Sequence, residues 1–144
     1  METVKLELEV PKKDYDKELE SFLDYTLNYS DIFSTHCIGY WGRGIRVETE
    51  ETDYKHWLIH EYDDDDAYEN FRNVDYDSII KDYLEGKEIP ENFHVLDKEL
   101  ATKAFNELLK RVYKKGRSLQ SLDYDADDED VAIQYAVFGK LVYG

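Results

Sequence analysis

The segment 34–46 concentrates residue types that bind small molecules. It contains three of the seven glycines, one of the two tryptophans, the only cysteine, two arginines and no acidic residue. Glycine lets the backbone approach a ligand closely, aromatic rings offer flat faces, and arginine fits phosphate or carboxylate. We predict a binding site formed by His36, Gly39, Tyr40, Trp41, Arg43 and Arg46. The competing interpretation is a glycine-rich turn whose aromatic residues pack into the core.

A small, anionic, nucleotide-like ligand would suit these residues. Tyr40 or Trp41 would stack on its base, Arg43 or Arg46 and glycine amides would hold its phosphate, and His36 would add a donor. Because the whole chain is acidic, such a site must be locally basic and well formed. A homo-oligomer with the site at its interface would help to meet this requirement.

The sequence offers no convincing catalytic constellation. Nucleophilic catalysis requires a serine or cysteine positioned beside a base. Cys37 follows His36, but adjacent side chains rarely point toward each other, and a lone cysteine is more often buried and unreactive. The glycines of 39–44 lack the spacing and the Lys-Ser/Thr ending of a phosphate-binding loop. We therefore expect a protein that is not an enzyme and has no cofactor.

Metal binding is also not expected. His56 and His60 could share a helix face, but the residues between them favour a strand, which would separate the two imidazoles by about 13 Å. The aspartates of 123–127 match the first three ligand positions of a calcium loop. Asp128 and Gln134 then stand where glycine and a bidentate glutamate are required, so this loop does not complete a calcium site.

Length and charge restrict the class of protein. A chain of 144 residues with 42% hydrophobic content fits a single domain, 1–144, with one core. Its formal charge of −16 disfavours direct binding to nucleic acid or to an anionic membrane. The sequence has no apolar run of membrane-spanning length and no signal-peptide pattern, and one cysteine excludes a disulfide framework. We expect a cytoplasmic protein.

Hydrophobic periodicity predicts an α+β fold, with about four helices packed on a small antiparallel sheet. Strands are expected at 4–10, 45–49, 54–62 and 141–144, a turn at 63–66, and helices at 14–28, 76–84, 97–115 and from 123–130 to 138. Gly86, Gly116 and Gly139 are placed to end the last three helices.

The charged residues are clustered, and the clusters suggest a second function. Six acidic residues lie in 123–130 and four in 63–66. They could imitate the phosphates of a nucleic acid and occupy a basic groove of a partner protein, with surface tyrosines as anchors. Two simpler interpretations are a solvated acidic surface and helix-end cations of 98–117 that face helix-start anions of 123–130.

Two segments carry a resemblance to known sequences. Ile38-Gly39-Tyr40-Trp41 and the ending 137–144, with its Phe-Gly-x-x-Val-Tyr-Gly pattern, together resemble a widespread group of small uncharacterised phage and prophage proteins. The chain departs from that pattern at 35–37, where a glycine-containing pair is usual, and at Lys140, where an acid is common. The resemblance implies a phage protein acting against host defences, either by sequestering the nucleotide-like ligand as an immune signal or as an acidic mimic that occupies a basic groove of a host defence protein.

Overall fold

The computed structural model describes residues 3–5, 9–28, 38–48, 54–62, 73–114 and 124–144. Their elements, in chain order, are β1 Thr3–Lys5, β2 Glu9–Pro11, α1 Lys12–Asn28, the 3-10 turn η1 Ile38–Tyr40, β3 Gly42–Val47, β4 His56–Glu61, α3 Tyr76–Leu84, β5 Phe93–Leu96, α4 Lys98–Lys114 and α5 Ala126–Phe138. Within this part of the chain, four helices accompany an antiparallel three-stranded sheet of order β3-β4-β5. The predicted α+β fold is confirmed.

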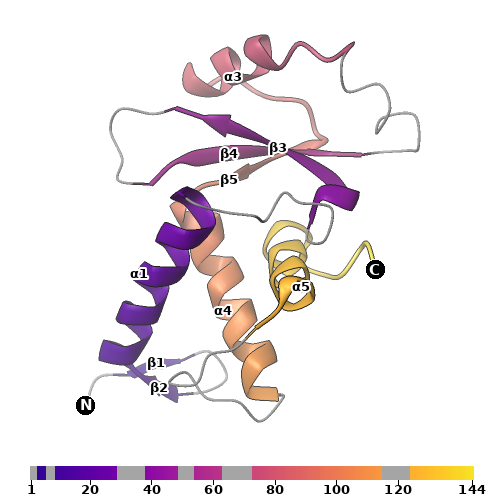
Figure 1. The fold of residues 1–144 in the computed structure, drawn as a ribbon. Coiled ribbons are helices and arrows are strands. Elements are labelled where there is room, and N and C mark those ends of the chain that lie inside the picture. The colour runs from indigo at the N-terminus through magenta and orange to yellow at the C-terminus, as the bar shows by residue number, and fades with distance from the viewer. Residues whose placement is uncertain (1–2, 6–8, 29–37, 49–53, 63–72, 115–123) are drawn as a thin grey trace.

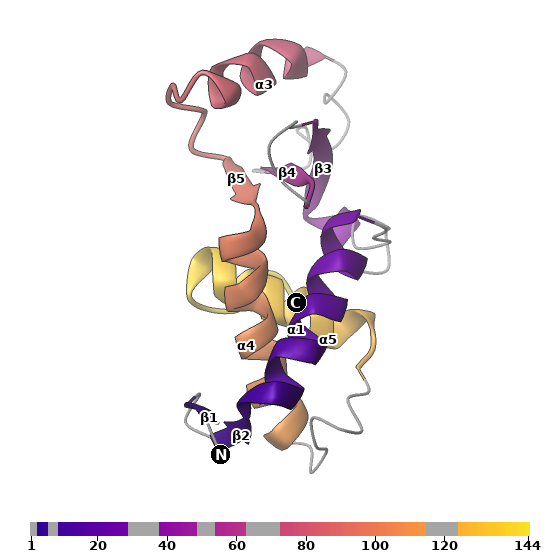
Figure 2. The same ribbon diagram turned by 90° about the vertical axis from the view of Figure 1, so that its left-hand side faces the viewer.

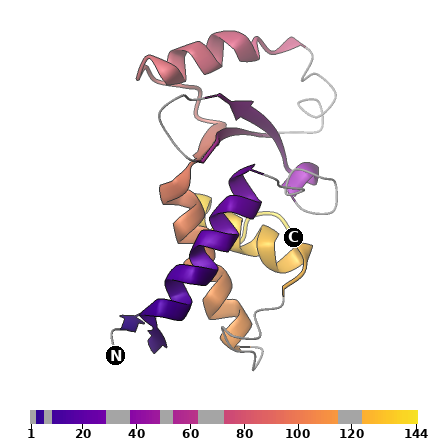
Figure 3. The same ribbon diagram turned by 60° about the vertical axis from the view of Figure 1, so that its left-hand side comes forward.

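The sheet lies between two helical layers. Helix α3 covers one face, and α1, α4 and α5 lie against the other, as Figure 1 shows. The views in Figures 2 and 3 agree, and they place the small β1-β2 pair at the end of α1 farthest from the sheet. Figure 3 also shows the C-terminal residues close to α5 and η1.

The alternation of side chains in β4 explains why the sheet has two apolar faces. His56, Leu58 and His60 face α3, whereas Trp57 and Ile59 face the three-helix layer. The larger core lies on the latter side, where Phe22 of α1, Phe105 of α4 and Ile133 of α5 are buried. A smaller core under α3 contains Val47, Leu58 and Phe93.

Helices α1 and α4 follow their predicted spacing. Phe22, Leu23 and Leu27 lie at helical intervals and are buried, and the ring of Phe22 lies 5.3 Å from that of Phe105. The hydroxyl of Tyr15 also donates a 2.6 Å hydrogen bond to Asn106 Oδ1. These contacts hold α1 against α4. Both helices belong to the layer that packs against one face of the sheet.

Three sequence predictions about strands are corrected. The expected strand at 4–10 is instead two short strands, β1 and β2, which pair with each other. Strand β5 was not predicted, because its apolar residues lie close to the start of α4 and were assigned no strand of their own. Residues 141–144 form no strand; the side chain of Gln134 binds their backbone instead.

The second half of the predicted glycine segment is not a loop but strand β3. Gly42 lies where β3 packs closely against β4, and a Cβ atom there would come within 2.9 Å of Ile59 Cγ2. Glycine at this position therefore serves close strand packing rather than ligand access.

The predicted helix ends at Gly86 and Gly139 are confirmed. Both have φ +74°, the left-handed conformation in which a side chain is strained. The predicted turn at 63–66 and the stop at Gly116 lie outside the described residues. Among the residues that the structure describes, no helix is both long enough and apolar enough to span a membrane.

Candidate functional site

A hollow of about 520 Å³ lies where η1, the first turns of α5 and the C-terminal residues meet. We call residues 139–144 the tail and this cavity the tail hollow. Its lining consists of Tyr40, Asp127, Asp130, Val131, Leu141, Tyr143 and Gly144. The hollow thus joins the predicted binding segment to the far end of the chain.

Helix α5 begins with an arrangement that fixes the acidic side of the hollow. Asp125 is the N-cap, and its side chain accepts a 2.9 Å hydrogen bond from the Asp128 backbone N–H, while the Asp128 side chain accepts a 3.2 Å bond from the Asp125 backbone N–H. Acidic residues in the first turn also complement the helix dipole. Because Asp127 and Asp130 are three residues apart, both lie on the side of the helix that borders the hollow.

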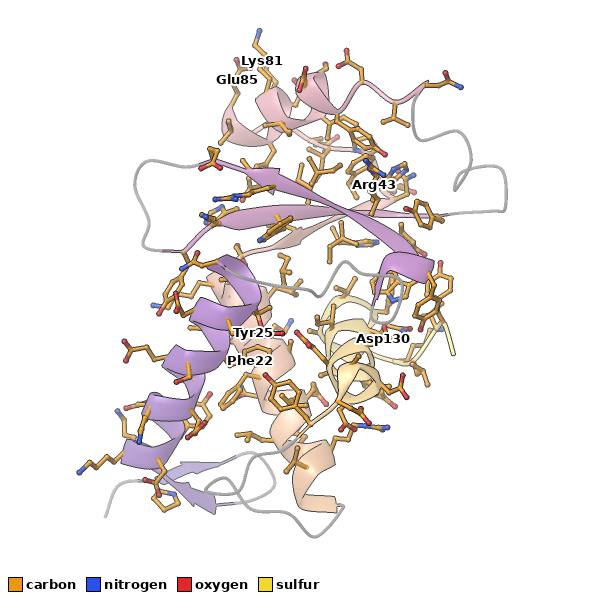
Figure 4. All side chains as sticks on the ribbon, viewed as in Figure 1. Phe22, Tyr25, Arg43, Lys81, Glu85 and Asp130 are labelled. Carbon is orange, nitrogen blue, oxygen red and sulfur yellow. The ribbon has the colours of Figure 1, made fainter. Side chains whose placement is uncertain are left out.

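Asp130 is the centre of a buried hydrogen-bond network. Its Oδ1 accepts bonds from Trp41 Nε1 at 2.7 Å and from Gln134 Nε2 at 2.9 Å. Its Oδ2 accepts a short hydrogen bond from the Tyr40 hydroxyl. The residue is only 6% exposed, and these three donors are neutral. Within the described part of the chain, this buried carboxylate at the edge of the hollow is therefore surrounded by neutral hydrogen-bond donors rather than by a cation. Figure 4 shows Asp130 on α5 below η1.

Gln134 binds the tail to α5. Its Oε1 accepts bonds from the backbone N–H groups of Val142 at 3.0 Å and Tyr143 at 2.7 Å, and its Nε2 donates to the Tyr143 carbonyl at 2.9 Å. The left-handed Gly139 lets the chain turn back toward the helix after α5. Gln134 is fully buried, and its side-chain amide finds its hydrogen-bond partners in Asp130 and the tail backbone.

Tyr143 connects this hydrogen-bond network to the sheet. Its ring stacks on the indole of Trp41, and its hydroxyl donates a short hydrogen bond to Glu61 Oε2. Glu61 Oε1 lies 2.8 Å from His94 Nε2. The tail is thus attached to β4 and β5 as well as to α5.

The structure brings some predicted site residues together and separates others. Tyr40 and Trp41 meet at Asp130, and Tyr40 is 44% exposed in the hollow, whereas Trp41 is 1% exposed. Arg43 and Arg46 lie on opposite faces of β3 because they are three residues apart in a strand. Gly39 is buried in η1.

The two arginines have different surroundings. Arg43 lies toward α3, near Tyr76 (Figure 4). Burial raises the pKa of Tyr76, and the charge of Arg43 offsets only part of this rise. Arg46 forms an exposed 3.1 Å ion pair with Glu48. The predicted contribution of His36 lies outside the described residues.

Not all of the acidic side chains of segment 123–130 lie on the surface. Asp128, Glu129 and Asp130 are 0%, 7% and 6% exposed, so they do not contribute the solvated carboxylates that a phosphate mimic needs. Arg111 Nε lies 2.6 Å from Asp128 Oδ1. This ion pair confirms the interpretation that cations near the end of one helix face anions at the start of the next.

Tyr124, just before α5, has an unusual environment. Burial raises its pKa far above the ordinary value of 10, and the nearby carboxylate of Glu129 raises it further. Its ring lies 6.3 Å from that of Phe22, so it belongs to the contact between α1 and α5 rather than to the tail hollow.

The histidines of β4 have structural partners. His56 Nδ1 and His60 Nδ1 each lie 2.8 Å from a tyrosine hydroxyl of α3, those of Tyr83 and Tyr76 respectively. Within the described ranges no group of three or more His, Cys, Asp or Glu residues could hold a metal ion. Cys37, the one nucleophile considered above, lies outside them.

A second hollow, of about 610 Å³, lies beside the first turns of α4. Its lining consists of His56, Asp97, Lys98, Glu99, Thr102 and Lys103. Two acidic and two basic residues line it, and Lys98 lies over the ring of Tyr54. The balanced charge gives this hollow no preference for an anion or a cation.

Sequence reasoning missed Asp130 and Gln134. Asp130 was hidden within a run of six acids, and Gln134 was considered only as an unsuitable calcium ligand. Their spacing of four residues was the available signal, since residues at i and i+4 share a helix face. Comparison with family models, with curated proteins and with solved structures gives no match to this chain.

Proposed function

We propose that this protein is a non-enzymatic binding protein that engages a basic partner through the tail hollow. The observation that carries the proposal is the carboxylate of Asp130, which borders the hollow with neutral donors around it. A cationic group of the partner would stabilise this carboxylate more strongly than water does, because charge-assisted hydrogen bonds are the stronger ones.

The overall charge supports the same partner. A formal charge of −16 attracts basic surfaces over several ångströms and raises their association rate. Asp127 adds an exposed carboxylate at the hollow itself. A basic partner is therefore favoured both at long range and in contact.

The resemblance to phage proteins supplies the biological setting of the proposal. In that setting the partner is a host defence protein with a basic groove, met in the host cytoplasm, and occupation of the groove inhibits it. The two segments that carry the resemblance, 38–41 and 137–144, meet at the hollow through Tyr40, Trp41 and Tyr143.

A small anionic ligand has less support at this site. It would face the carboxylates of Asp127 and Asp130, and the ring of Trp41 is covered by Tyr143. Arg43 and Arg46 do not converge within one chain. A homo-oligomer that combined arginines from two copies would provide an anion site, and that assembly remains a prediction.

The test is calorimetric titration with two classes of probe. We expect an arginine-rich peptide to bind, and the affinity to fall as salt rises to physiological strength, where the screening length is about 8 Å. A peptide of equal length with citrulline in place of arginine is the neutral control. The double variant Arg43→Ala, Arg46→Ala should bind the basic peptide as the parent does. Binding of a cyclic or ADP-ribose nucleotide, with the peptide inactive, would overturn the proposal.

A further inference from the structure

We infer that the tail hollow receives one arginine side chain of the partner. This inference rests on the proposed function and names the chemical group that the site recognises. A volume of about 520 Å³ is large enough for a long side chain together with part of its backbone.

The acceptors needed for a guanidinium are present in the hollow. A carboxylate offers about four lone-pair positions, and three donors bind Asp130, two of them at Oδ1 and one at Oδ2. The remaining position is therefore on Oδ2, beside Tyr40. Asp127 lies one helical turn earlier on the same side of α5, and its carboxylate is exposed. Two carboxylates at this spacing suit a planar group with several donors.

The walls of the hollow suit the apolar part of the arginine side chain. Tyr40 is 44% exposed and Leu141 is 46% exposed, and Val131 of α5 also lines the hollow. Methylene groups can pack on Val131 and Leu141 while the charged end reaches the carboxylates. A guanidinium can also stack on the face of the Tyr40 ring.

This combination favours arginine over other cations. Lysine carries a compact, strongly hydrated charge that neither stacks on a ring nor binds two acceptors in one plane. Within the described residues the site lacks the group of three ligands that a metal ion would need. Shape and donor geometry, rather than charge alone, should therefore select the occupant.

The experiment is a heteronuclear NMR titration of the full chain with three short peptides that differ at one central position: arginine, lysine or citrulline. We expect the arginine peptide to shift the amide resonances of Tyr40, Asp127, Val131 and Leu141. Lysine should bind about tenfold more weakly and citrulline should cause no shift at these positions.

Two variants test the assigned contacts. Asp127→Asn should weaken arginine binding about tenfold, and Tyr40→Phe, which keeps the ring, should bind better than Tyr40→Ala. Glu20→Gln on the exposed side of α1 is the matched control for loss of one negative charge and should leave the affinity unchanged.

The outcomes separate the inference from the proposed function. If the lysine peptide binds equally well at the hollow, the hollow does not select arginine and only the inference fails. If the arginine peptide binds with shifts confined to other surfaces, the basic partner does not use the hollow and the proposed function fails with the inference. If no basic peptide binds, both fail. Because Asp127 and Glu20 are exposed, neither variant should disturb folding.

Discussion

The phenol ring of Tyr143 lies parallel to the indole of Trp41, with ring centroids 5.5 Å apart and planes 4° apart. The sequence led us to expect that Trp41 would stack on a ligand, but the tail supplies the aromatic partner from within the chain. Phe138 packs on the same indole at 5.6 Å, which completes its enclosure. The segments 38–41 and 137–144 therefore share a structural role in addition to any role in binding.

The Tyr143 contact should contribute measurably to stability. Tyr143→Ala removes a stacked ring and a hydrogen bond to Glu61, and we expect the free energy of unfolding to fall by about 2–4 kcal/mol. Tyr143→Phe keeps the stacking and should lose only about 1 kcal/mol. Urea denaturation followed by tryptophan fluorescence measures both. Equal losses in the two variants would mean that the stacking contributes little.

Gln134 should determine whether the tail stays on α5. Gln134→Ala removes three bonds to the tail and one to the buried Asp130, and should lower the free energy of unfolding by about 3 kcal/mol. The amides of Val142 and Tyr143 should then exchange with solvent faster than in the parent. Tyr135→Ala changes the neighbouring, 42% exposed position and is the control. Unchanged protection of the tail amides in Gln134→Ala would contradict this role.

Loss of the ion pair between Arg111 and Asp128 should destabilise the protein, because the Asp128 end of the pair is buried. The Asp128 side chain is 1% exposed and that of Arg111 is 38% exposed. Arg111→Ala leaves the carboxylate without its cation, and after allowance for solvent at the arginine we expect a loss of about 2 kcal/mol. Lys110→Ala, which removes a half-exposed pair with Glu107, should cost under about 1 kcal/mol. Chemical denaturation compares the two, and equal losses would show that burial of Asp128 adds nothing.

The sequence was sufficient to predict the helices and strands that depend only on short-range patterns of residues. The helical spacing of Phe22, Leu23 and Thr26 and the alternation of 56–61 depend only on neighbouring residues, so α1 and β4 were predicted within a few positions. Gly139 was predicted as a helix end for the same reason. The tail hollow was not predicted, because it joins residues about ninety positions apart, such as Tyr40 and Asp130.

The role of the acidic residues was the least predictable feature. Asp127 and Asp130 belong to the same run, yet one is exposed and the other is buried under three donors. Composition treats them alike, because burial depends on tertiary contacts: Tyr40 and Trp41 cover Asp130, whereas Asp127, one turn nearer the start of α5, stays exposed. The proposed ligand is cationic, whereas the sequence had suggested an anionic one, for a related reason. Arg43 and Arg46 are close in sequence and were assigned to one site, but in a strand they point to opposite faces.

Tyr124 should make the stability of the protein fall at alkaline pH. Burial, assisted by Glu129, raises its pKa above the value of 10 that we take for the unfolded chain. Above that pH the unfolded state releases the phenolic proton and the folded state keeps it, so the stabilising effect is complete below pH 10 and is lost as the pH rises further. Tyr124→Phe should therefore lose less stability than the parent between about pH 9 and 11.5, measured by urea denaturation at each pH. Tyr15, whose pKa burial also raises, leaves a residual slope in the variant. Identical pH dependence in the two proteins would show that Tyr124 ionises equally easily in the folded and unfolded states.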